Sequence, residues 1–110
     1  IAVGTPRNWR RAVAWARASR GAMVAVPDDA ILDAMRTTAR LAGVFGEPAG
    51  VTGVAGLRAA VSSGLVSPDA RVLVVVTGNG LKDIQTAAQA AGRPHDIRPT
   101  LDDVEALVRG

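Results

Sequence analysis

The stretch RVLVVVTGNGLKD, from Arg71 to Asp83, decides the expected fold class. The run 72–76 is apolar without alternation, which is typical of a central strand that is covered on both faces. It stops at the turn TGNG (77–80), and a helix is predicted from there to about Ala91. Ligands of open α/β sheets bind at the carboxyl ends of strands. The stretch therefore predicts a strand whose end presents a group to a ligand.

The rest of the chain alternates between apolar runs and helical periodicity. Apolar runs predict strands at 1–3, at 22–26 and, as a short edge strand, within 92–99. Helical spacing, with Pro, Asp or Thr at the start and Gly at the end, predicts helices over 8–20, 28–42, 51–63 and 101–110. This alternation predicts an α/β fold with a small, mainly parallel sheet and flanking helices. Because so few short strands are a thin basis for an independent sheet, we expect residues 1–110 to be one piece of a larger domain.

Composition bears on metal and membrane functions. The chain of 110 residues has no Cys and a single His, His95, which excludes a thiolate or multi-histidine metal site. The longest apolar runs are far shorter than a membrane span, so we expect no membrane partner. The lack of cysteine fits a cytoplasmic location, which we expect for this chain. The first residue is Ile1 rather than Met, which indicates an excerpt of a longer chain.

The net charge of +3 raises the question of nucleic-acid binding. However, twelve of the thirteen basic residues are arginines spread along the chain, and RNWRR (7–11) is their only local cluster. Two Trp, one Phe and no Tyr leave few aromatic side chains on which bases could stack. We therefore expect no nucleic-acid partner.

Three interpretations of TGNG stay open on the residues alone. A dinucleotide-binding loop follows G-x-G-x-x-G, but Asp83 replaces the third glycine and would repel a pyrophosphate. The turn can also be a purely structural connection. In the third interpretation Thr77 offers its hydroxyl to a heterocyclic ligand. Gly78 and Gly80 then permit unusual backbone angles and a close approach of that ligand.

Four segments resemble motifs of the threonine synthases, which are pyridoxal-phosphate enzymes with the tryptophan-synthase-β-like fold. TGNGLKD (77–83) looks like their C-terminal signature, and VFGEPAG (44–50) is similar to their F-x-E-P-A-S segment. VGTPRNW (3–9) resembles their I-G-N-P-x-N-W segment, and AMVAVPDDAIL (22–32) looks like their strand-then-helix run. The four occur in the family's order and at its spacing. The resemblance implies that 1–110 is a single C-terminal fragment of such a three-layer catalytic domain.

The resemblance also implies roles for four residues. Thr77 matches the hydroxyl that hydrogen-bonds the pyridine nitrogen of pyridoxal phosphate, and Glu47 matches an acid close to the cofactor ring. Gly78 and Gly80 match the tight loop beside the ring. The implied reaction converts O-phospho-homoserine and water to threonine and phosphate. A neutral hydroxyl compensates a buried pyridinium less well than a carboxylate does, so the ring should be less electron-withdrawing.

The sequence departs from the family at Gly50, where the family has Ser, and at Thr5, where it has Asn. The family's Schiff-base lysine and its glycine-rich phosphate loop lie in its N-terminal part, so no catalytic residue is implied within this chain. Lys82 is the one lysine here, and we interpret it as an exposed residue at a helix start that pairs locally beside Asp83. Covalent chemistry needs a desolvated lysine.

We therefore expect the isolated chain to be inactive. Its expected partners are the N-terminal part of the enzyme and the substrate O-phospho-homoserine, with a homodimer as a further expectation. Two alternatives remain. One is a non-catalytic interaction module that binds a partner chain or itself through an open sheet edge. The other is a related pyridoxal-phosphate dehydratase that acts on threonine or serine.

Overall fold

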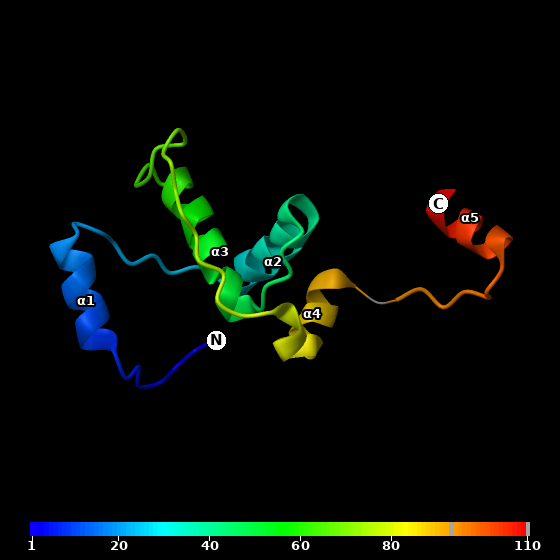
Figure 1. The fold of residues 1–110 in the computed structure, drawn as a ribbon, viewed down its shortest axis with the longest axis horizontal. Coiled ribbons are helices and arrows are strands. Elements are labelled where there is room, and N and C mark those ends of the chain that lie inside the picture. The colour runs from blue at the N-terminus through cyan, green and yellow to red at the C-terminus, as the bar shows by residue number, and fades with distance from the viewer. Residues whose placement is uncertain (93, 110) are drawn as a thin grey trace.

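The computed structural model describes residues 1–92 and 94–109. These residues form five α-helices and one short 3-10 helix, shown in Figure 1. The elements are α1 (Trp9–Ala18), α2 (Asp28–Ala42), α3 (Pro48–Ser62), η1 (Gly80–Asp83), α4 (Ile84–Ala91) and α5 (Leu101–Arg109). Arg93, in the predicted edge strand, and Gly110, in the last predicted helix, lie outside the described residues.

The centre of the molecule consists of α2, α3 and α4 (Figure 1). Polar contacts link the three helices: Arg36 donates to the carbonyl of Ala90 at 3.1 Å, and Arg58 pairs with Asp33. Between the helices lies a small apolar cluster that is almost free of solvent contact. Its buried members are Ile31, Ala34, Met35, Val51, Ala55 and Ala90. Because this cluster is made mainly by α2 and the first half of α3, it fixes the N-terminus of α3 and the loop before it.

The predicted parallel sheet is wrong. Within the described residues no strand forms, and the only β-type pairing is an isolated antiparallel bridge between Gly46 and Asn79. A strand exists only where a neighbouring segment completes its hydrogen bonds. The apolar runs 22–26 and 72–76 have no such neighbour in the described chain. Leu73 is accordingly 88% exposed.

The predicted helices are confirmed, with small changes at their ends. Gly43 ends α2 in the left-handed conformation with φ of +65°, as a C-terminal glycine should. The first helix ends differently: α1 stops at Ala18, and Arg20 rather than Gly21 takes the positive φ, at +56°. Trp9 is 51% exposed, and α1 has no buried residue.

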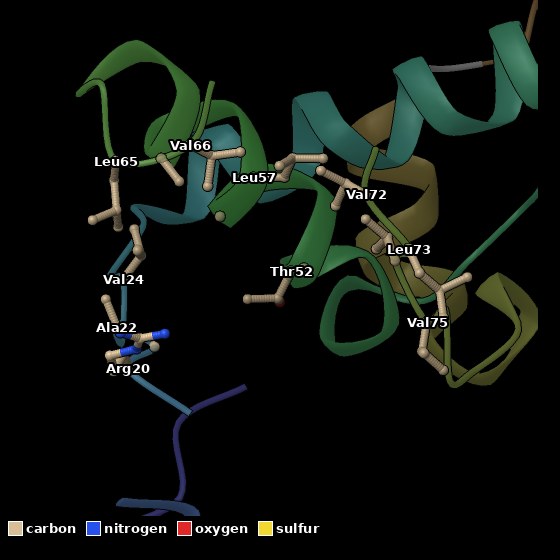
Figure 2. Close-up of a pocket in the computed structure, with 15 residues that line it drawn as sticks. Arg20, Ala22, Val24, Thr52, Leu57, Leu65, Val66, Val72, Leu73 and Val75 are labelled. Atoms are coloured by element: carbon tan, nitrogen blue, oxygen red, sulfur yellow. The ribbon is translucent and has the colours of Figure 1, made fainter. Parts of the chain in front are cut away.

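Much apolar surface is uncovered. The accessible surface is 8937 Å², whereas a compact monomer of 11.3 kDa exposes about 5,700 Å². One result is a groove of about 620 Å³ along α3, between the segments 20–24 and 72–75. Figure 2 shows Thr52 and Leu57 of α3 between these two segments. Apolar side chains of these segments are exposed, among them Val24, Val72 and Val75.

The structure also bears on membrane insertion and metal binding. In the part of the chain that the structure describes, no helix is long and apolar enough to cross a membrane. Among the same residues, no group of three or more His, Asp or Glu side chains is placed to hold a metal ion. The cytoplasmic location and the lack of a nucleic-acid partner stay predictions.

Candidate functional site

Two loops that are distant in the sequence meet at the candidate site. The backbone N–H of Glu47 donates to the carbonyl of Gly78 at 2.9 Å, and the N–H of Gly80 donates to the carbonyl of Phe45, also at 2.9 Å. These two bonds form the bridge between Gly46 and Asn79. The bridge joins the connection before α3 to the turn TGNG. The structure therefore brings together all four residues that the resemblance implicated.

The Glu47 side chain occupies the space that a side chain at position 78 would need. A Cβ built at position 78 would lie 2.0 Å from Glu47 Oε1 and 2.3 Å from its Cδ. The Phe45 ring covers Gly80 in the same way, with ring carbons 2.5–2.6 Å from a built Cβ. Neither glycine has a positive φ. The expectation of unusual backbone angles is thus wrong, and close approach is what these positions require.

Gly50 contributes to the same contact from the first turn of α3. A Cβ there would lie 2.9 Å from the backbone nitrogen of Gly78 and 3.1 Å from its carbonyl oxygen. Gly50 is buried, and Pro48 begins the helix just before it. In the sequence, Gly50 is notable only as a departure from the family motif. The structure shows that a glycine lets α3 approach the TGNG backbone.

Thr77 lies at the edge of an open hollow of about 410 Å³ that is lined by residues 43–45 and 76–79. Its side chain is exposed. Among the described residues, the Thr77 hydroxyl forms no hydrogen bond. A hydroxyl has one proton to donate and lone pairs to accept. This hydroxyl is therefore available to a ligand that enters the hollow.

Glu47 is the most covered charged group of the site. Its side chain is 17% exposed, and its Oε1 accepts a hydrogen bond from Lys82 Nζ at 3.3 Å. Lys82 is 66% exposed, as expected for a residue at a helix start. The expected local pairing with Asp83 is wrong, because Asp83 instead caps α4. Its carboxylate accepts from the N–H of Thr86 at 3.1 Å, and hydrogen bonding by the Thr86 side chain, followed by that of its N–H, lowers the pKa of Asp83.

Comparison with known proteins places the chain in a family. A family profile described as pyridoxal-phosphate dependent enzyme matches residues 1–78. The threonine synthase of Halalkalibacterium halodurans is 39% identical over 113 residues, which cover 98% of this chain and 32% of that protein. The threonine synthase of Mycobacterium bovis is 44% identical over 87 residues, or 79% of this chain and 24% of that protein.

The similarity extends to archaeal proteins. The threonine synthase of Methanosarcina acetivorans is 36% identical over 110 residues, which cover 100% of this chain and 27% of that protein. The chain thus spans 24% to 32% of the length of these relatives. The family profile covers most of the chain and includes Glu47, Thr77 and Gly78. The chain belongs to the pyridoxal-phosphate dependent enzymes and is similar to threonine synthases.

Proposed function

We propose that this chain is the C-terminal part of a threonine synthase that converts O-phospho-homoserine and water to threonine and phosphate. The observation that carries the proposal is the free hydroxyl of Thr77 beside the hollow, held next to Glu47 by a two-bond bridge. The similarity to threonine synthases supports the choice of reaction.

The residues present fit pyridoxal phosphate. A neutral, uncommitted hydroxyl suits an aromatic ring nitrogen, and the close contacts at Gly50 and Gly78 keep side chains out of the turn beside it. Thr77 would hold the ring nitrogen, while Glu47, Gly78 and Gly80 would bound the ring. When bound, the cofactor supplies an electron sink for breaking bonds at the carbons of an amino acid.

The proposed reaction removes the phosphate group from the γ-carbon of the substrate and adds a hydroxyl group from water at the β-carbon. The γ-carbon–oxygen bond breaks and phosphate leaves, while the oxygen of water bonds to the β-carbon and the γ-carbon becomes a methyl group. This chain would position the ring-nitrogen side of the site. A lysine that carries covalent chemistry has to be desolvated, and the exposed Lys82 is not. We propose that the isolated chain is inactive.

The partner that we propose for this chain is the remainder of the same enzyme. The groove along α3 and the exposed side chains of 72–75 offer apolar surface for it to cover. A homodimer of complete subunits is a further part of the proposal. In both cases the substrate site is completed by residues from outside this chain.

The test uses the complete polypeptide that carries these residues. Thr77→Val removes the hydroxyl and nearly preserves the shape, whereas Thr77→Ser keeps the hydroxyl and is the matched control. One lost hydrogen bond of about 1–1.5 kcal/mol corresponds to a fall of about tenfold in kcat for Thr77→Val. Threonine and phosphate formation from O-phospho-homoserine is measured together with cofactor content. A Thr77→Val enzyme with unchanged kcat would contradict the assigned role.

Substrate profiling separates the remaining alternatives. Turnover of O-phospho-homoserine, without turnover of threonine or serine, supports the synthase. Release of ammonia from threonine or serine, with no threonine formed, would show a dehydratase instead. A complete polypeptide that binds no pyridoxal phosphate would refute the enzyme proposal and leave an interaction module.

A further inference from the structure

The ion pair between Glu47 and Lys82 links the two loops of the site through their side chains. The residues are 35 positions apart, and Nζ lies 3.3 Å from Oε1. Their exposure is unequal, since the Glu47 side chain is 17% exposed and that of Lys82 is 66% exposed. The carboxylate is thus largely withdrawn from water and depends on its partner for compensation, while the ammonium group remains hydrated.

The backbone holds Lys82 in reach of Glu47. The Asn79 side chain accepts from the N–H of Leu81 at 2.9 Å, and the Asn79 carbonyl accepts from the N–H of Lys82 at 3.1 Å. These bonds shape η1 directly after the bridge. The turn therefore carries Lys82 back toward the loop that contains Glu47.

Within the described residues, no ion pair other than that with Lys82 compensates Glu47. On η1, Asp83 is engaged by the N–H of Thr86. On α2, Asp28 lines a separate hollow of about 200 Å³ with Pro48 and Asp83. Both are acids and would repel the carboxylate. Among the described residues, Lys82 is the one cation that forms an ion pair with Glu47.

We propose that Lys82 is a positioning residue that holds the Glu47 carboxylate against Gly78 and cancels its charge, so that the neutral Thr77 alone sets the protonation of the cofactor's ring nitrogen. This inference rests on the proposed function. An unpaired carboxylate beside the ring would favour a protonated nitrogen, because an opposite charge nearby stabilises the charged form. Lys82 would remove that influence through its ion pair with Glu47.

The experiment follows the ring nitrogen directly in the complete enzyme. The chemical shift of the isotope-labelled ring nitrogen of bound pyridoxal phosphate is measured across pH. Lys82→Met leaves Glu47 unpaired, so the pH midpoint for protonation of the ring nitrogen rises by about one pH unit. This is the lower end of the usual effect of a nearby charge, because the ion pair is partly solvated. Lys82→Arg keeps the charge and the wild-type midpoint. Lys82→Met combined with Glu47→Gln returns the midpoint toward the wild type.

The matched control is Arg109→Met, which removes a cation of the same charge from an exposed ion pair with Glu105 in α5. It leaves the midpoint unchanged. An unchanged midpoint in Lys82→Met would overturn the inference. So would a midpoint in the Lys82→Met, Glu47→Gln double variant that is raised as much as in Lys82→Met alone. Thr77→Val separates this outcome from failure of the proposed function. If Thr77→Val changes the nitrogen shift and Lys82→Met does not, only the role of Lys82 is refuted. If neither changes it, the cofactor site itself is refuted.

Discussion

Replacing Gly78 with Ala tests whether the position of the Glu47 carboxylate matters more than the stability of the turn. The added Cβ would lie 2.0 Å from Glu47 Oε1, whereas ordinary contact begins at 3.4 Å, so the carboxylate has to move by about 1.4 Å. The obstructing atoms are the carboxylate and Cγ of Glu47, which belong to a flexible side chain. The free energy of unfolding therefore falls by at most about 1 kcal/mol, the value of the partly exposed pair with Lys82. A displacement of about 1 Å in a catalytic site nevertheless lowers kcat by up to about 100-fold.

Two other glycines provide matched controls for Gly78→Ala. At Gly50 the obstructing atom is the backbone nitrogen of residue 78, at 2.9 Å, which cannot swing aside. Gly50→Ala therefore lowers the free energy of unfolding by about 1–3 kcal/mol. Gly56 lies in the same helix with nothing within 4 Å among the described residues, so Gly56→Ala is neutral or stabilises by up to about 1 kcal/mol unless the remainder of the enzyme fills the groove that Gly56 lines.

The assay combines urea unfolding with the rate of threonine formation in the complete polypeptide. We expect Gly78→Ala to lose much of its kcat and little of its free energy of unfolding. Gly50→Ala should lose more free energy of unfolding than Gly78→Ala does. If Gly78→Ala keeps the wild-type kcat, Glu47 has no positional role. If Gly78→Ala destabilises more than Gly50→Ala does, the reasoning about flexible and rigid neighbours is refuted.

Three further predictions concern stability in the same polypeptide. Val51 has no exposed surface, so Val51→Ala lowers the free energy of unfolding by about 1–3 kcal/mol in urea titrations, and a neutral result would contradict the observed core. Leu73 is 88% exposed in this chain. If the rest of the enzyme covers it, Leu73→Ala lowers the free energy of unfolding by about 2–5 kcal/mol. If Leu73 stays exposed, the loss is below about 0.5 kcal/mol. The hydrogen bond from Arg58, more than the charges of Arg58 and Arg36, lowers the pKa of Asp33. The ionised Asp33 therefore stabilises the fold above the usual carboxyl pKa, and this stabilisation is lost as pH falls through the lowered pKa. Thermal unfolding between about pH 5 and pH 2 should therefore show a steeper decline for the wild type than for Asp33→Asn, and parallel curves would refute this role.

The helices were predictable because their hydrogen bonds are local. Helical spacing of Ile31 and Met35 together with the terminal Gly43 predicted α2 nearly to the residue. Strand formation depends on distant partners, and an apolar run such as 72–76 carries no information about whether its neighbour is present. The same composition that predicted a central strand therefore gives an exposed, unpaired segment in the described chain.

The site was predictable in its members but not in its contacts. The resemblance selected Thr77, Glu47, Gly78 and Gly80, and the structure brings their loops together. That Glu47 lies against Gly78 and pairs with Lys82 is a contact across more than 30 positions, which no local pattern encodes. Gly50 carried no distinctive signal, since α3 also contains Gly53 and Gly56, and Gly56 has nothing within 4 Å.

The bridge between the two loops has a consequence for how these positions vary through evolution. Because the Phe45 ring fills the space beside Gly80, and Glu47 fills the space beside Gly78, each pair should change together. A homologue with a small residue at the position of Phe45 has room for a side chain at the position of Gly80. A homologue with a short acid in place of Glu47 similarly tolerates Ala at position 78. Covariation between 45 and 80, and between 47 and 78, is the evolutionary signature expected of this contact.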